Sequence, residues 1–310
     1  MDGFINLLKP VGPTSSQVVN RVRRLTGNKK VGHTGTLDPG ASGVLPICLG
    51  KATKLSALIT NSGKVYSAEI TFGVTTDTQD KYGKVLKECR ANIKKERIEE
   101  LLQEFKGPQR QIPPMYSAIK QGGVKLYELA RKGIEVERKA RDIEIYRLEL
   151  ADYFPPDRAV IEIECSKGTY IRTLCHDIGI MSGYGAIMSS LTRLSAGEFR
   201  LDNAVTLVEL ENAKSQGKLD RMMLPIDYPL KHMPKVFVKD SSLKYALNGN
   251  RLYAHNLATN SVDYNHGQQL RLYNGHTLLG IYSYNCDTQP PCFRIQMLLT
   301  DADAQSVKKP

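Results

Sequence analysis

The sequence predicts an α+β fold that ends in a small β-rich domain. Two segments, 64–72 and 159–165, alternate apolar and polar residues as half-buried strands do. Elsewhere apolar residues recur at three- and four-residue spacing, which indicates amphipathic helices. Near the C-terminal end, two strand-like runs, 269–273 and 277–284, flank Asn274-Gly275, a pair typical of a tight β-hairpin. A chain of 310 residues has room for about two domains.

Strands and helices are expected to alternate along the N-terminal part of the chain. One helix begins with Ser15 or Ser16 as its cap and ends at Gly27, because glycine readily adopts the left-handed conformation that stops a helix. Thr206, with Glu209 three residues later, forms a capping box that starts another helix. The other expected elements are strands at 3–8 and 44–49 and helices at 51–59, 98–105 and 171–178.

Two segments interrupt this alternation. Residues 109–141 are basic and punctuated by proline and glycine, with one short helix near 125–132, so we expect an extended arm there. The pattern changes again around 229–234, beyond which short strands dominate. We therefore expect a domain at residues 1–230 and a compact, mostly β domain at 231–310.

The chain is strongly basic. Lys and Arg number 43 against 32 Asp and Glu, which gives a net charge of +11 and an isoelectric point near 9.3. Such an excess most often meets a polyanion, either a nucleic acid or an acidic membrane face. With 41% hydrophobic and 24% charged residues, the composition is that of a globular protein rather than a disordered one.

Several kinds of protein and site are not indicated. No apolar run approaches the ~18 residues of a membrane span, and the N-terminus shows no export signal, so we expect a cytoplasmic protein. The six cysteines form no C-x-x-C pair, so we expect reduced core residues rather than a zinc site or disulfides. Ala52 follows Gly50-Lys51 where a phosphate-binding loop needs Ser or Thr, and no G-x-G-x-x-G follows a strand. If the chain is an enzyme, we expect no cofactor.

Asp38 is an isolated carboxylate in a basic, glycine-rich segment. The first 60 residues contain eight Lys or Arg but only two acids, Asp2 and Asp38. Nearby cations favour the ionised form of a carboxylate, which is the form that a nucleophile requires. The ordinary alternative is a turn aspartate that precedes Pro39 and caps its own backbone. Composition by itself favours that alternative.

Five blocks in order along the chain together resemble the bacterial tRNA pseudouridine-55 synthases of the TruB family. The blocks are LLKPVGPTS at 7–15, GHTGTLDP at 32–39, KVY at 64–66, TDTQD at 76–80 and CSKGTYIRTL at 165–174. The resemblance runs to about residue 230, and 113–118 with 125–127 fits the family's thumb-like insertion. The tail is similar to a PUA-type RNA-binding domain. The resemblance implies a mixed, largely antiparallel sheet with flanking helices and a thumb insertion, followed by a small β-rich, PUA-like domain.

The resemblance implies an RNA isomerase that needs no cofactor. Its family converts uridine-55 in the T arm of tRNA to pseudouridine by breaking the N–C glycosidic bond and joining the ribose to carbon 5 of the same base. By motif, Asp38 is the catalytic carboxylate; attack on the ribose, attack on the base and elimination through a glycal stay open. Arg172 is implied to pair with Asp38, and Tyr66 to stack on the flipped uracil. Without the resemblance, Tyr66 reads as a core tyrosine and Arg172 as a surface arginine.

Five further residues are implied to act at the substrate. His33 would fill the space that the everted base leaves, since everting a base costs a few kcal/mol. Tyr170 and Leu191 would line the uridine pocket, Asp80 would hydrogen-bond the uridine, and Lys9 would support the catalytic loop. The ordinary alternatives are a turn residue for His33 and Asp80 and a buried core residue for Leu191.

The basic residues fit a tRNA stem-loop better than a generic anion. Backbone phosphates would meet Arg21, Arg23, Arg24, Lys29, Lys30, Lys120, Lys125, Arg131 and Lys132, with a solvated basic face as the alternative for each. The expected partner is therefore the T-arm stem-loop of tRNA, with no membrane and no obligate protein partner. Two rival functions stay open: the same chemistry on another RNA, and a non-catalytic RNA-binding or RNA-folding protein.

Overall fold

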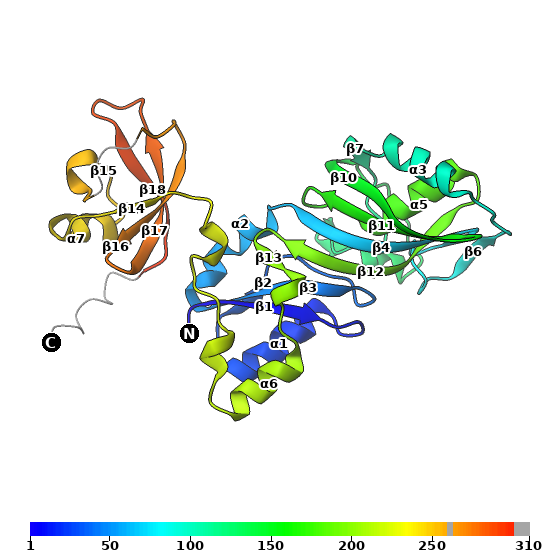
Figure 1. Cartoon of the computed structure of the whole chain (residues 1–310), viewed down its shortest axis with the longest axis horizontal. Helices are drawn as coiled ribbons and strands as arrows, with labels where there is room; N and C mark the ends of the chain where they lie inside the picture. Colours follow the sequence, from blue (N-terminus) through cyan, green and yellow to red (C-terminus); the bar gives the residue numbers. More distant parts are fainter. Residues whose placement is uncertain (259–262, 301–310) are drawn as a thin grey trace.

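The computed structural model describes residues 1–258 and 263–300, which contain a nine-stranded and a five-stranded sheet (Figure 1). The larger sheet consists of β1 (Gly3–Lys9), β2 (Val31–His33), β3 (Ser42–Leu49), β4 (Lys64–Phe72), β7 (Gly107–Gln111), β10 (Arg141–Phe154), β11 (Arg158–Cys165), β12 (Ala186–Ala196) and β13 (Phe199–Arg200). Its main path runs β1-β3-β12-β4-β11-β10-β7. Only β12 and β3 pair in parallel among these described strands. The predicted α+β fold with a mixed, largely antiparallel sheet is confirmed.

Four helices cover one face of this sheet. They are α1 (Ser15–Thr26), α3 (Lys95–Glu104), α5 (Ile171–Ser182) and α6 (Leu207–Ser215). Their apolar side chains join those of β4 and β11 in one buried cluster, in which the alternation of β4 places Tyr66, Ala68, Ile70 and Phe72. The first turns of α1 and α5 therefore lie at the edge of a continuous core, and this position determines which of their polar residues face inward.

The start of α1 differs from the sequence prediction. Its N-cap is Thr14, which forms a capping box with Gln17, rather than Ser15 or Ser16. Ser15 is buried instead, because its hydroxyl accepts a hydrogen bond from Leu37 N at 2.9 Å and lies 3.0 Å from Leu37 O. The stop at Gly27 (φ 66°) is confirmed, as is the Thr206 capping box.

Residues 51–59 were expected to form one helix, but two shorter elements occupy this segment. A 3-10 helix, η1 (Gly50–Leu55), is followed by α2 (Ser56–Thr60). Hydroxyls bond to carbonyls three residues earlier, from Thr53 to Gly50 and from Ser56 to Thr53. This i to i−3 spacing matches the tighter helix and explains the break.

The expected arm is shorter than 109–141, because both of its ends belong to the large sheet. Helix α3 ends at Glu104, and β7 already begins at Gly107. Strand β7 pairs with β10, so the segment between them is 112–140. This segment holds the small ribbon of β8 (Lys120–Gln121) and β9 (Val124–Lys125) and the helix α4 (Leu126–Ala130), which confirms the short helix.

The C-terminal part is β-rich, as predicted. Its sheet has the order β14-β16-β17-β18-β15 and consists of β14 (Lys235–Phe237), β15 (Leu252–Tyr253), β16 (Gln269–Asn274), β17 (Thr277–Asn285) and β18 (Cys292–Leu298), with α7 (Leu243–Leu247) beside it. The hairpin at Asn274-Gly275 is confirmed. Residues 259–262 and 301–310 of the expected tail domain lie outside the described residues.

A second buried cluster joins the two sheets. It combines Phe4 and Phe199 of the large sheet with Leu230 of the connecting segment and Tyr273 and Ile281 of the small sheet. The small sheet lies beside α2 and the N-terminus (Figure 1). Because these side chains are buried together, the tail packs on the larger sheet rather than hanging from a linker.

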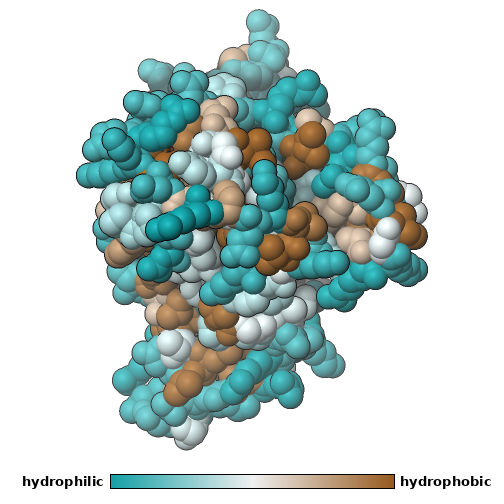
Figure 2. All heavy atoms as spheres, turned by 90° about the vertical axis from the view of Figure 1, so that its right-hand side faces the viewer, coloured by the Kyte–Doolittle hydropathy of each residue, from teal (hydrophilic) through white to brown (hydrophobic). Residues whose placement is uncertain are grey.

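The surface is mostly polar. On the side that carries β6 (Val85–Glu88) and β7, hydrophobic side chains lie in small separate groups (Figure 2). Within the described ranges, no helix has the length and apolar character needed to cross a membrane. Cys89 and Cys286 are exposed, so the expectation that all six cysteines are core residues is wrong for these two.

Candidate active site

A cleft of about 1320 Å³ opens where β4, β12, the start of α5 and the arm meet. This volume exceeds the roughly 300–1,000 Å³ of small-molecule pockets, so the cleft has room for a larger ligand. Seven basic and three acidic residues line it: Lys64, Lys125, Arg131, Arg141, Lys167, Arg172, Arg193, Asp38, Asp80 and Asp142. The excess of positive charge suits a polyanion.

Arg172 and Asp38 form an ion pair in this cleft. Arg172 Nε lies 2.9 Å from Asp38 Oδ2, with the arginine side chain 4% and the aspartate 40% exposed. The same guanidinium donates to Thr78 O and to Tyr116 O, both at 3.0 Å, and lies 3.8 Å from Asp80 Oδ2. Arg172 is therefore a buried residue and not the surface arginine that its helix position suggested. It ties the Asp38 loop to the arm and to the segment after β5 (Val74–Thr76).

Buried groups hold the backbone on both sides of Asp38. Ser15 bonds the main chain of Leu37, as described above, and Lys9 Nζ donates to Ala41 O at 2.7 Å. Ala41 N in turn donates to Asp38 O at 3.0 Å. Because the flanking backbone is held from behind, the partly exposed carboxylate points from a fixed loop toward the cleft.

Gly40 lets this loop pack closely against the cleft wall. A Cβ atom at Gly40 would overlap the ring of Tyr82, which lines the same cleft. The glycine-rich sequence of the loop thus permits close packing against an aromatic side chain.

Tyr66 and Leu191 form an apolar patch of the cleft wall. They come from the neighbouring strands β4 and β12 and are 9% and 7% exposed. Burial raises the pKa of Tyr66, an effect that the guanidinium of Arg193 opposes. A flat ring and a branched alkyl group in the same cleft as the Asp38 carboxylate offer a surface on which a planar base can stack.

Sequence comparisons agree with these motifs. Residues 23–171 match the TruB family pseudouridylate synthase (N terminal domain), and residues 172–231 match the tRNA pseudouridylate synthase B C-terminal domain. A tRNA pseudouridine synthase B of Alkaliphilus oremlandii is 46% identical over 273 residues, which are 88% of this chain and 90% of that relative. One of Pelotomaculum thermopropionicum is 46% identical over 286 residues, 91% and 90% of the two chains.

The chain belongs to the TruB family. Solved structures extend the likeness to the whole fold: a chain of a Cbf5-Nop10-Gar1 complex aligns with a TM-score of 0.75 at 26% identity, covering 97% of this chain and 86% of that one. A chain of an H/ACA RNP bound to a substrate RNA containing 2′-deoxyuridine aligns with the same TM-score at 25% identity and the same coverage. Because both alignments cover nearly the whole chain, they include the β-rich C-terminal part.

The residues that the TruB motifs single out divide into two groups. Asp38, Tyr66, Arg172, Tyr170, Leu191 and Asp80 all line the cleft. Lys9 and His33 do not belong to its lining: Lys9 is fully buried behind the loop, and His33 ends β2 instead of lying in a loop. Burial lowers the pKa of His33, and its Nδ1 is buried without a hydrogen-bond partner among the described residues.

Hydrogen bonds hold Asp80 within its own turn and Tyr170 against a distant strand. Asp80 Oδ1 accepts from Thr78 Oγ1 at 2.6 Å and from Tyr82 N at 3.0 Å, so the turn alternative for Asp80 is present in the structure. Tyr170 N donates to Gln111 Oε1 at 2.8 Å, and Gln111 Nε2 donates back to Tyr170 O at 3.0 Å. The buried Gln111 of β7 thereby positions the tyrosine at the cleft edge.

Arg193 is a buried cation that the sequence interpretation missed. It is 1% exposed and donates to Val44 O at 2.7 Å and to Gly35 O at 3.1 Å. Among the described residues no carboxylate lies within 4.0 Å of it, and its partners are these carbonyl groups and the side chain of Tyr66. Its position could have indicated this, because Arg193 follows Leu191 by two residues and therefore lies on the same face of the strand.

Lys9 should give protein stability a specific dependence on pH. Burial lowers the pKa of Lys9 to about 8, whereas the unfolded chain titrates near its ordinary value of 10.5. Between these values the unfolded chain binds more protons, so the free energy of unfolding rises with pH over this range. We expect Lys9→Met to lose this rise, measured as the urea midpoint at several pH values from 7.5 to 10.5.

The variant also loses the bonds to the loop carbonyls and should be less stable at every pH. The contribution of Lys9 is the difference between the two proteins in the slope of urea midpoint against pH. Other titrating groups contribute equally to both slopes and cancel. Parallel curves for the two proteins would show that Lys9 keeps its proton throughout.

Proposed function

We propose that this protein isomerises uridine-55 in the T loop of tRNA to pseudouridine, with Asp38 as the nucleophile and without a cofactor. The observation that carries this proposal is the Asp38–Arg172 ion pair at the wall of a large, positively lined cleft. The relatives named tRNA pseudouridine synthase B support the tRNA substrate. The tRNA is also the one partner that the proposal requires.

The ion pair suits the first chemical step. A guanidinium bonded to Asp38 and to two backbone carbonyls holds the carboxylate in a fixed orientation. In each route the bond between nitrogen 1 and the ribose breaks; after the base turns, its carbon 5 bonds to carbon 1 of the ribose, Asp38 is regenerated as the free carboxylate, the proton on carbon 5 leaves and nitrogen 1 gains one. The overall reaction conserves every atom, so side chains suffice as reagents. Attack on the ribose, attack on the base and elimination through a glycal all begin from this geometry.

The apolar wall suits an everted base. Uracil taken out of the helix would stack on Tyr66 against Leu191, with Asp80 and Tyr170 at the cleft edge to bond its polar groups. In this proposal the Tyr66 hydroxyl also accepts a proton. His33 lies outside the cleft lining, and we propose that it fills the space that the everted base leaves in the RNA loop.

We further propose that residues 1–230 carry the reaction and that residues 231–310, as a PUA-like domain, bind RNA. The buried cluster between the two sheets supports these separate roles, because it holds the tail at a constant distance from the cleft.

The same chemistry on another RNA is a rival function with its own test. Modification mapping of total RNA, with and without the protein, would identify a different RNA substrate.

Asp38→Asn should separate binding from chemistry. We expect the rate of isomerisation to fall at least about a thousandfold, because an amide is not a nucleophile at this position. Release of label from carbon 5 of uridine in a minimal T-arm hairpin measures the reaction, and a filter assay measures binding. Affinity should change little, since the phosphate contacts remain. Full turnover by the variant would remove Asp38 as nucleophile, and an RNA-binding protein without catalysis would show no label release in either form.

Arg172→Lys tests whether orientation of Asp38 matters as well as charge. A lysine keeps the positive charge but has a single ammonium, which cannot reach Asp38, Thr78 and Tyr116 together. We expect kcat to fall by about a hundredfold, the cost of a small misplacement of a reacting group, with KM for the hairpin nearly unchanged. Equal kcat in both proteins would show that charge alone suffices.

Lys29 and Lys30 provide a test of the RNA-binding surface. Both are exposed between α1 and β2, at the β1 edge of the large sheet. Changing both to alanine should weaken tRNA binding more at low than at high salt and reduce the slope of log affinity against log salt by up to about two. The control changes Lys94 and Lys95, beside β10 near the opposite edge, and removes the same charge. Equal slopes for the two double variants would exclude a phosphate contact at 29–30.

A further inference from the structure

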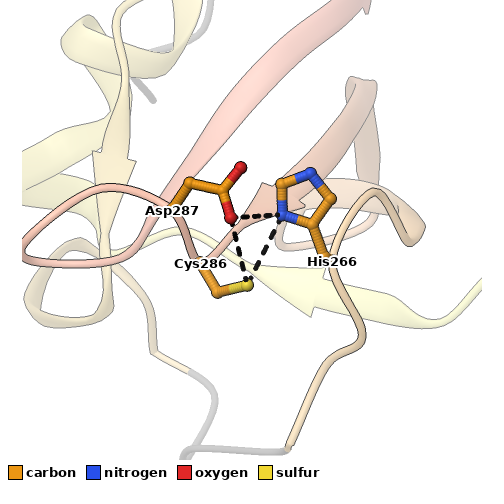
Figure 3. Close-up of side chains that lie close together, drawn as sticks. All are labelled: His266, Cys286 and Asp287. Atoms are coloured by element: carbon orange, nitrogen blue, oxygen red, sulfur yellow. Dashed lines mark hydrogen bonds and ion pairs between the residues drawn. The ribbon is translucent and has the colours of Figure 1, made fainter.

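Three metal-binding side chains meet on the C-terminal β-rich domain, far along the chain from the cleft residues (Figure 3). His266 precedes β16, and Cys286 and Asp287 directly follow β17. Cys286 Sγ lies 3.4 Å from His266 Nδ1, which lies 3.4 Å from Asp287 Oδ1; Sγ and Oδ1 are 3.9 Å apart. One donor atom from each residue thus points to a common centre.

These separations fit the donor spacing of a zinc ion. Zinc bonds of about 2.3 Å to sulfur and about 2.0–2.2 Å to nitrogen and oxygen, at tetrahedral angles, place neighbouring donors about 3.3–3.6 Å apart. Two of the three edges fall in this range, and the third is slightly longer. We propose that His266, Cys286 and Asp287 bind one zinc ion, with water in the fourth position. A thiolate with an imidazole and one carboxylate favours zinc over magnesium or calcium.

The backbone places these donors together before any ion binds. Successive residues of a strand point to opposite faces, yet Cys286 and Asp287 both face His266. A turn explains this, because Asp287 N donates to Asn285 Oδ1 at 3.0 Å. On the other side, Gly267 N donates to Tyr284 O at 2.8 Å and anchors the His266 loop to the end of β17. Binding of an ion therefore requires little further ordering of the backbone.

Sequence spacing alone does not reveal this group. The cysteine and the aspartate are adjacent, and the histidine lies twenty residues earlier, which matches no zinc-finger pattern. The ordinary alternative is an exposed ion pair of His266 with Asp287 and a neighbouring thiol, without metal. Thiol reactivity distinguishes these alternatives, because a zinc-bound thiolate is shielded from reagents.

The test uses the full-length reduced protein, first treated with a chelator, and zinc as the only ligand added. Cys89 and Cys286 are the exposed thiols, so two cysteines should react with an aromatic disulfide in the absence of zinc. One equivalent of zinc should slow the reaction of the Cys286 thiol by at least about tenfold and leave the reaction of the Cys89 thiol unchanged. Substitution by cobalt should add a thiolate-to-metal absorption band.

Matched variants assign the effect. Cys89→Ser should keep the zinc-protected thiol, whereas His266→Gln should lose both the protection and the cobalt band. Both variants change exposed side chains. Thiol reactivity and the cobalt band are measured without RNA, so the outcome is independent of the proposed function. Zinc that fails to protect Cys286, or that protects it equally in His266→Gln, would overturn the proposal.

Discussion

The guanidinium of Arg172 is the constraint on which the rest of the site depends. A cation that is 4% exposed must have partners, and here they come from three separate segments: Asp38, Thr78 O and Tyr116 O. The loop, the segment after β5 and the arm therefore converge on the first turn of α5. Because one buried charge needs these partners, the same contacts that form the wall of the cleft also orient the Asp38 carboxylate.

The buried positive charges around Asp38 lower the stability of the folded state. Arg193 is buried beside carbonyl groups without a carboxylate among the described residues, and such a cation destabilises the folded state unless an anion approaches. Lys9 shows the same cost, since burial lowers its pKa to about 8. A cleft of this kind is most favourable when a polyanion fills it, and this coupling links the stability of the site to substrate binding.

Packing between the sheets extends this arrangement to the tail. Phe199 contacts Phe4 at a ring distance of 5.4 Å and Tyr228 at 5.2 Å, and the cluster continues into Tyr273 of the small sheet. Aromatic contacts in a shared core resist rotation of one part against the other. An RNA that spans both parts would thus meet a surface of constant shape.

The sequence by itself determined the elements whose signals are local. Alternation predicted β4 and β11, a capping box predicted α6, and Asn274-Gly275 predicted the hairpin, because each depends on neighbours within a few residues. Ordered motifs also singled out Asp38, Tyr66 and Arg172. Errors arose where a distant partner competes: Ser15 bonds Leu37 instead of capping its helix, and residues 109–111 of the expected arm belong to β7 because they pair with β10.

Only the tertiary structure decided which of these residues meet. The ion pair joins positions 38 and 172, the buried charge of Arg193 depends on the register of β12 against β3 and β4, and His266 reaches Cys286 through a hairpin. Such contacts follow from strand register and helix packing, which no short stretch of sequence encodes. The residue types of the site were therefore readable from the chain, while its geometry was not.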